Sequence, residues 1–165
     1  MSIISPIYKK IVSAHSAMEI IMLNFNIVLI ISSVVLFAMS IGLGGFLKFY
    51  DKYPWWDRLL HFVSAGLFVS YGVALTRGMV ELNKFSVLVF GFTLSMTLHV
   101  LWEMGEYVLD TATHSNHQRW QKHHPAHNHN PKGAIQPAGL VDTMNDTAFC
   151  IAGTILACAI WWLFL

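Results

Sequence analysis

The residues best suited to chemistry lie in residues 99–110, the sequence HVLWEMGEYVLD at the end of an apolar run. This stretch contains an imidazole at His99 and three carboxylates at Glu103, Glu106 and Asp110. Because each residue of an α-helix turns about 100°, the four side chains fall within an arc of about 60° on one helix face. Burying these groups in an apolar helix is costly, and a metal ion is the simplest group that compensates the cost.

Two further pairs begin other apolar segments. Asp57 and His61 are four residues apart, as are Asp142 and Asp146, so each pair occupies one face of a helix. In a bundle of four membrane helices that alternate in direction, both pairs and the acidic end of residues 99–110 reach the same membrane boundary. Six of the nine acidic residues then gather there. The acidic residues elsewhere are Glu19, Asp51 and Glu81.

Carboxylates and histidines that project inward from bundle helices are typical ligands of divalent metals. We therefore predict a site for one or two divalent ions, and zinc, iron, manganese and magnesium are all open. The candidate metal ligands are Asp57, His61, His99, Glu103, Glu106, Asp110, Asp142 and Asp146. The candidate catalytic residues are Glu103, Glu106 and Asp142.

Structural roles remain open for several of these residues. Asp57 and Asp142 are suited to capping the N-termini of helices. His99 is suited to a hydrogen bond with a Ser or Thr of the core. The acids that end residues 99–110 lie at a helix C-terminus, where the helix dipole disfavours negative charge, so they need a cation or solvent. An ion pair between Arg58 and one of the acids is a further alternative.

A histidine-rich stretch, HSNHQRWQKHHPAHNH, follows at residues 114–129. Imidazole binds zinc, copper, nickel or iron, but the spacing matches neither a zinc finger nor a metalloprotease helix. A loop that supplies or covers the metal site and a solvated loop that binds metals opportunistically are both open. The histidines are His114, His117, His123, His124, His127 and His129.

The composition indicates a membrane protein. Hydrophobic residues make up 55% of the chain, charged residues 12%, and the mean hydropathy is +0.54, which is too apolar for a soluble domain of 165 residues. The net charge of +1 and the lack of a basic tract give no indication of nucleic-acid binding, so membrane lipid is the expected partner. Cys150 and Cys158 have no CxxC spacing, and we interpret them as packing residues.

The hydropathy pattern predicts an all-α integral membrane protein with one domain over residues 1–165. An amphipathic interfacial helix is expected over residues 1–22, with a signal peptide as the alternative. Four transmembrane helices form the rest of the expected bundle, with a histidine-rich loop at residues 111–141. The transmembrane helices are expected over residues 25–47, 59–75, 85–107 and 147–165.

The basic residues give the expected orientation. The side with the 47–58 and 111–141 loops has six Lys and Arg residues, and the other side has four. Positive charge favours the cytoplasmic side, so we expect these loops in the cytoplasm and the helices in the cell's inner membrane. The oligomeric state is open.

Three short elements form an ordered pattern: WWDRLLHFVSAG at 55–66, LWEMGEY at 101–107 and DTMNDTAFCIAGTI at 142–155. The pattern resembles that of the YjdF-type family of small bacterial inner-membrane proteins. That family has an Asp and a His four apart at the start of one span, then Trp-Glu-x-x-Glu, then Asp-Thr-x-x-Asp before a Gly-containing span. The resemblance covers roughly residues 50–155 and implies no reaction. Its motif positions here are Asp57, His61, Glu103, Glu106, Asp142 and Asp146.

These observations favour a metal-dependent membrane enzyme, a hydrolase or transferase acting on a lipid or lipid-linked substrate at the bilayer boundary. A di-iron oxidoreductase acting on acyl chains is a variant of the same idea, because carboxylates with two histidines suit that metal pair. A metal transporter or metal-buffering protein is an alternative, although a conducting path usually has polar residues through its depth. A structural or assembly subunit of a membrane complex, with acids that lock the bundle, is the last alternative.

Overall fold

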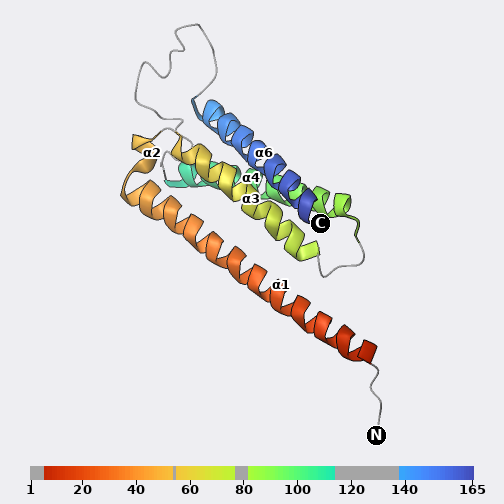
Figure 1. Cartoon of the computed structure of the whole chain (residues 1–165). Helices are drawn as coiled ribbons and strands as arrows, with labels where there is room; N and C mark the ends of the chain where they lie inside the picture. Colours follow the sequence, from red (N-terminus) through yellow and green to blue (C-terminus); the bar gives the residue numbers. More distant parts are fainter. Residues whose placement is uncertain (1–5, 54, 77–81, 114–137) are drawn as a thin grey trace.

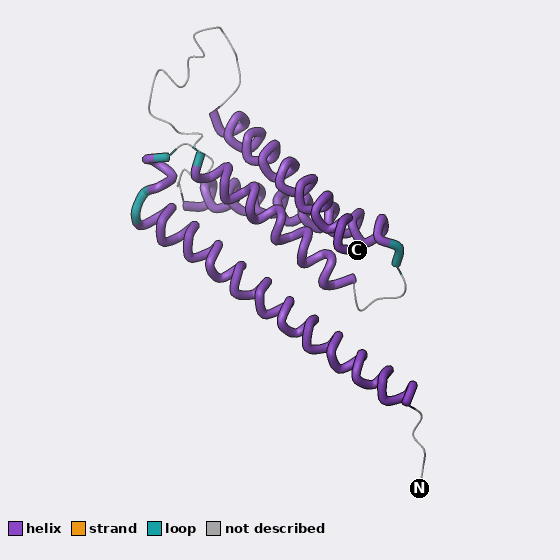
Figure 2. The backbone as a smooth tube through the Cα atoms, viewed as in Figure 1, coloured by secondary structure: helices purple, strands orange, loops and turns teal. Residues whose placement is uncertain are grey.

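The computed structural model of the chain describes residues 6–53, 55–76, 82–113 and 138–165. Within these ranges every regular element is a helix and no strand occurs (Figure 2). The all-α prediction is therefore confirmed for the described part of the chain. The elements are α1 (Pro6–Ala38), η1 (Met39–Phe46), α2 (Phe49–Lys52), α3 (Trp56–Thr76), α4 (Lys84–Thr113) and α6 (Ala138–Phe164), as Figure 1 shows.

Four helices are long and apolar enough to cross a membrane. They have 21 to 30 residues, and about 20 apolar residues suffice to cross the hydrocarbon of a bilayer. Each contains nearly all of one transmembrane segment predicted from hydropathy, so the expectation of four membrane-length helices is confirmed. The four candidate spans are Glu19–Phe46, Trp56–Thr76, Lys84–Thr113 and Gly139–Phe164.

The two helices beside the histidine-rich loop are longer than predicted. α4 continues to Thr113, and the hydroxyls of Thr111 and Thr113 donate to carbonyls one turn earlier in the same helix. α6 begins at Ala138 and not at residue 147, so the prediction of its start is wrong. Asp142 and Asp146 were expected on this helix, and the structure extends it to residues 138–141, which were expected in the loop. Residues 114–137 of the predicted loop, with all six of its histidines, lie outside the described residues.

The N-terminal segment and the first span form one helix in the described structure. α1 runs from Pro6 to Ala38 and continues into the π-helix η1, without the separation predicted between residues 22 and 25. The sequence has no proline or glycine between Pro6 and Gly42, so nothing local stops the helix. An interfacial location for residues 1–22 stays a prediction.

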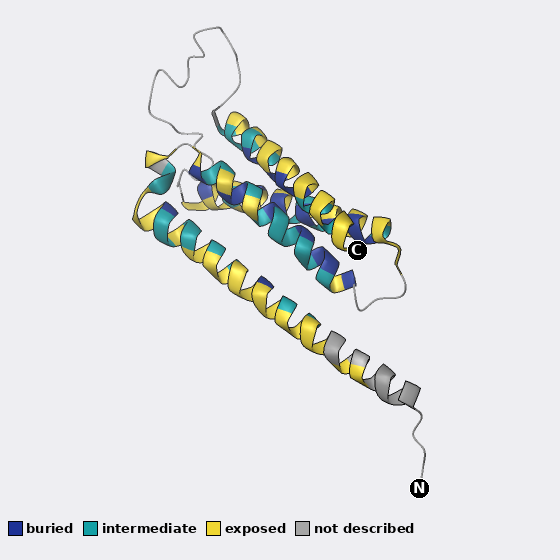
Figure 3. Ribbon diagram, in the orientation of Figure 1, coloured by how far each residue is buried: buried dark blue, intermediate teal, exposed yellow. Residues whose placement is uncertain are grey.

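The helices α3, α4 and α6 pack against one another and form the core, and their buried sides face inward (Figure 3). α1 lies beside α3 and diverges toward its N-terminus (Figure 1). It touches the core through a 2.8 Å hydrogen bond between Ser33 and Tyr71 and an edge-to-face contact of Phe25 with Trp161. From Glu19 to Ala38, most of its other side chains are exposed and apolar, as expected where a helix faces lipid.

Glycines set the close approach of the core helices. A Cβ on Gly72 of α3 would meet the backbone of Gly91 in α4, and a Cβ on Gly153 of α6 would meet the carbonyl of Phe62 in α3. Small residues at such crossings let membrane helices come close enough for side chains at neighbouring turns to meet. The glycine contacts therefore help to set how near the polar residues of α3, α4 and α6 come to one another.

Candidate metal centre

One end of the three-helix core contains most of the candidate ligands. α3 and α6 begin at this end and α4 ends there, because the three helices alternate in direction (Figure 1). Helix α3 contributes Asp57 and His61, α4 contributes Glu103, and α6 contributes Asp146. The four residues come from segments far apart in the sequence, and the packing of the core brings them to one place.

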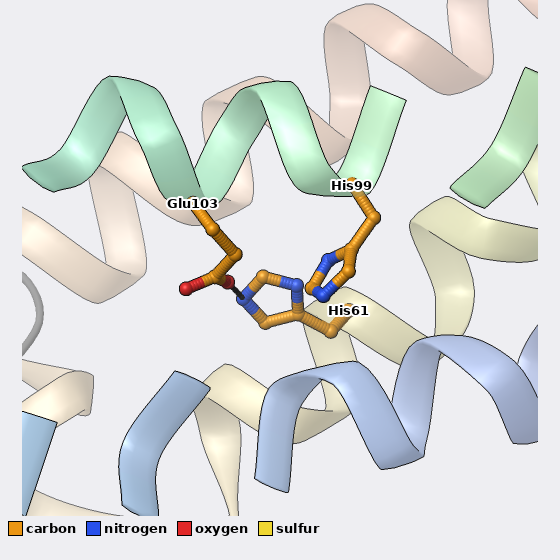
Figure 4. Close-up of side chains that lie close together, drawn as sticks. All are labelled: His61, His99 and Glu103. Atoms are coloured by element: carbon orange, nitrogen blue, oxygen red, sulfur yellow. Dashed lines mark ion pairs between the residues drawn. The ribbon is translucent and has the colours of Figure 1, made fainter. Parts of the chain in front are cut away.

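His61 belongs to two groups of candidate ligands, one with His99 and Glu103 and the other with Asp57 and Asp146. In each group, one possible ligand atom from every residue lies within 4.8 Å of the others. His61 Nε2 is 3.7 Å from Asp57 Oδ1 and 3.8 Å from Glu103 Oε1, the latter pair being drawn in Figure 4. Two ligands of a tetrahedral zinc ion are about 3.3 Å apart, so small side-chain rotations would bring these atoms to bonding distance.

The polar groups form two tiers that differ in burial. His61, Glu103 and Asp146 are buried, with 5% to 8% of each residue exposed, and His99 lies one turn deeper at 3%. The second tier is half-buried and lies about one turn closer to the end of the core on each helix. It consists of Asp57, Glu106 and Asp142. A cation that approaches from this end of the core therefore passes carboxylates before it reaches the histidines.

The carboxylates are close enough to repel one another. Asp146 experiences repulsion from Asp57, Asp142, Glu103 and Glu106. Glu106 is repelled by Glu103, Asp57 and Asp142, and its Oε1 accepts a 2.8 Å hydrogen bond from the half-exposed Trp102 of the same helix. Carboxylates that lie this close together favour a bound cation, because a positive ion turns repulsion into attraction.

Two threonines of α6 contact candidate ligands of α4. Thr143 donates a 2.9 Å hydrogen bond to Glu103 Oε2, and Thr147 Oγ1 lies 3.0 Å from His99 Nε2. The rings of His61 and His99 meet edge to face, with 5.1 Å between their centroids (Figure 4). A Ser or Thr partner was expected for His99, but neither Thr143 nor Thr147 was identified from the sequence. The signal was the repeated Asp-Thr pair in DTMNDT, which puts a hydroxyl beside each acid at helical spacing.

Comparison with known proteins places the chain in a family. The sequence model of a family described as "Predicted membrane protein (DUF2238)" matches residues 12–165. The chain belongs to this family. No curated protein and no solved structure gives a significant match.

Membership in DUF2238 and the four membrane-length helices together identify an integral membrane protein. The matched region includes every candidate ligand, from Asp57 to Asp146. The YjdF-type resemblance, the bacterial inner membrane and the orientation of the loops stay predictions.

Two sequence-based candidates have a different setting from the one expected. Asp110 of α4 is buried, with 2% exposed, but it belongs to neither ligand group of the described residues. Asp142 lies inside α6, four residues after its first residue, so a role as N-cap of that helix is excluded. Asp57 lies in the first turn of α3, where a carboxylate also interacts favourably with the helix dipole.

Proposed function

We propose that this DUF2238 protein is a metal-dependent membrane enzyme that binds a divalent ion between α3, α4 and α6. The proposal depends mainly on one observation. His61 Nε2 lies between Asp57 and Glu103, at 3.7 and 3.8 Å, within a buried region that Asp146 also reaches. The candidate ligands come from three helices. Glu103 is three residues from Glu106, and Asp146 is four residues from Asp142. Bundle proteins bind divalent metals with carboxylates and histidines arranged in a similar way.

The charges favour a metal over a purely ionic network centred on His61. A protonated His61 supplies one positive charge, whereas the carboxyl groups of Asp57, Glu103 and Asp146 all lie close to it. Burying ionised carboxylates is expensive unless they are paired. A divalent ion adds two positive charges at the point where the side chains converge, so it compensates the carboxylates better than one imidazolium.

The donor set narrows the choice of metal. His61 and His99 offer imidazole nitrogens, and their neighbours offer carboxylate oxygens. Imidazole suits zinc and iron, while magnesium favours sites made of oxygen and water. Mixed nitrogen and oxygen ligands therefore favour zinc, iron or manganese over magnesium at this position.

A bound ion would polarise a phosphoryl or acyl oxygen, or activate a water molecule for attack. Glu106 and Asp142 are half-buried on the outer tier, so they are placed to exchange a proton with a group that approaches the ion from the membrane boundary. Exposed apolar side chains such as Met104 and Met144 flank this end of α4 and α6. A lipid or lipid-linked molecule is the substrate class able to reach this place, and hydrolysis or group transfer is the reaction class.

Elemental analysis of detergent-purified full-length protein tests the proposal. The wild type is expected to contain close to one zinc, iron or manganese ion per chain after loading with one equivalent, and Glu103→Gln is expected to lose most of it. Glu19→Gln is the matched control, because Glu19 lies on α1 and outside both ligand groups. Turnover of lipid in mixed micelles that depends on the metal would support the enzyme. A metal-free wild type, or equal metal content in both variants, would reject the proposal.

Metal transport is a second candidate, and one observation favours it. Beyond His99, the buried Ser95 of α4 and Thr154 of α6 form a 2.8 Å hydrogen bond, so polar groups continue deeper into the core than expected. Uptake of zinc into proteoliposomes would favour transport over catalysis. The absence of uptake together with metal-dependent lipid turnover would favour the enzyme.

A further inference from the structure

The contact between α4 and α6 contains two parallel hydrogen bonds at the candidate metal centre. Thr143 and Thr147 are one turn apart on α6, and Glu103 and His99 are one turn apart on α4. The two helices run in opposite directions, so the threonines meet the two ligands at successive turns, at 2.9 and 3.0 Å. Two candidate ligands on one helix thus depend on two hydroxyls of another helix for their orientation.

The hydrogen bond from Thr143 fixes which oxygen of Glu103 is offered to a metal. The hydroxyl of Thr143 donates to Oε2 of Glu103. The other oxygen, Oε1, then faces His61 Nε2 at 3.8 Å (Figure 4). A carboxylate held in this way presents one oxygen to the ion, because rotation of the group would break the bond to the threonine.

The contact of Thr147 engages Nε2 of His99 and leaves Nδ1 as the nitrogen that can face a metal. A neutral imidazole has one nitrogen that donates and one that accepts. When His99 Nε2–H donates to Thr147 Oγ1, the lone pair is on Nδ1, and only Nδ1 remains to bind a metal. Histidines that bind metals usually donate their other N–H to a neighbouring group, which sets the tautomer and the ring orientation.

We propose that Thr143 and Thr147 are positioning residues of the metal centre, with Thr143 directing Glu103 Oε1 to the ion and Thr147 making His99 a ligand through Nδ1. This inference rests on the proposed function, because it assumes that a metal binds. It assigns to α6 a second role beside that of Asp146, namely the orientation of ligands on α4.

Thr154 provides a control within the same helix contact. Its hydroxyl forms a 2.8 Å hydrogen bond with Ser95 of α4, and both residues are completely buried. This bond joins the same two helices but involves no candidate ligand. Loss of the Thr154 bond therefore reports what a hydroxyl contributes to packing alone.

The test compares the zinc affinity of full-length wild type with that of Thr143→Val, Thr147→Val, Thr147→Ser and Thr154→Val, using competition with a chelator dye up to one equivalent of zinc. Valine keeps the shape of threonine and removes the hydroxyl. We expect affinity to fall by at least about tenfold in Thr143→Val and Thr147→Val, as is usual for groups that orient metal ligands. Thr147→Ser should bind zinc like the wild type, and Thr154→Val should lose thermal stability without losing affinity.

The outcomes separate this inference from the proposed function. If the wild type binds zinc but the Val variants at 143 and 147 bind it within about twofold of the wild type, the positioning role is rejected and the metal site stands. An equal loss of affinity in Thr154→Val would also reject it, because packing alone would then explain the effect. A wild type that binds no zinc overturns both.

A spectroscopic measurement on the wild type tests the same inference without requiring any variant to fold. Solid-state NMR of protein with isotope-labelled histidine distinguishes imidazoles that bind zinc through Nδ1 from those that bind through Nε2. The expected result is Nδ1 coordination by His99. Coordination by its Nε2, or a His99 signal that zinc does not change, would overturn the inference.

Discussion

Replacing Asp146 with Asn distinguishes a metal ligand from a structural acid, because the two roles predict different responses to metal. Asp146 is 5% exposed, and in its ligand group with Asp57 and His61 the ligand atoms lie within 4.8 Å of one another. Two ionised carboxylates whose oxygens are at most 4.8 Å apart repel each other by at least about 3.5 kcal/mol at an effective dielectric constant of about 20. Asparagine keeps the shape of the side chain and removes the charge. Without metal, Asp146→Asn should therefore raise the free energy of unfolding by a few kcal/mol, on the order of this repulsion.

Zinc should stabilise the wild type far more than it stabilises the variant. A ligand at 100 times its Kd that binds only the folded state stabilises a protein by about 2.7 kcal/mol, which corresponds to several degrees in Tm. The wild type should gain this stabilisation, and the variant should lose most of it because one ligand of the ion is gone.

The assay is thermal unfolding of the full-length protein in detergent, once with a chelator and once with zinc. In the chelator the Asp146→Asn variant should melt above the wild type, and zinc should raise the Tm of the wild type far more. Asp110→Asn is the matched control, since Asp110 is a buried acid outside both ligand groups, and it should keep the full response to zinc. An Asp146→Asn variant that melts below the wild type by the same amount in both conditions would refute the reasoning and indicate a structural network.

Two further predictions concern catalysis and packing. Glu106→Gln should lower metal-dependent lipid turnover by at least about 100-fold, because the half-buried Glu106 is placed to transfer a proton. Its metal content should be unchanged, because Glu106 lies outside both ligand groups. Unchanged turnover in a micelle assay would exclude that role. Gly153→Ala should lower the free energy of unfolding in detergent by about 1–3 kcal/mol, because the new Cβ would press on the carbonyl of Phe62. Gly105→Ala, where nothing lies within 4 Å of the added Cβ, should be tolerated, and equal effects of the two changes would contradict the packing account.

Part of the site could be predicted because it depends on helix geometry and order alone. Hydropathy gave the four membrane-length helices, and successive spans must alternate in direction. Spacings of four residues then placed Asp57 and His61 on one face of α3, and Asp146 at the same end of the core. The convergence of these residues with Glu103 follows from these rules and from the contacts of the core helices.

Other parts depend on neighbours that the sequence does not identify. The start of α6 at Ala138 was missed because residues 138–141 directly follow a long polar, proline-containing stretch, and the expected loop was extended to residue 141. Pro137 immediately before the helix was the local signal, since proline is favoured at helix starts. A threonine in a helix often bonds its own backbone, as Thr111 does, so only the structure shows that Thr143 bonds Glu103 instead.

Asp110 shows the limit of the helical-face argument. It shares the arc of His99 and Glu103 by angle, but it lies almost two turns beyond Glu103 along the helix axis. A helical wheel gives the direction of a side chain but not its position along the helix axis. Among the described residues of α4, only His99 and Glu103 belong to a ligand group. Side chains on one face meet at a common ion only when their heights also agree.

In the proposed metal centre, His61 and carboxylates of three helices surround one divalent ion. X-ray absorption spectroscopy at the zinc edge tests it most directly, on full-length protein loaded with one equivalent of zinc, together with His61→Gln. We expect nitrogen and oxygen ligands at about 2.0–2.1 Å, with scattering from imidazole, in the wild type and loss of the bound zinc in the variant. Zinc that is absent from the wild type, or whose spectrum is the same in His61→Gln, would contradict it.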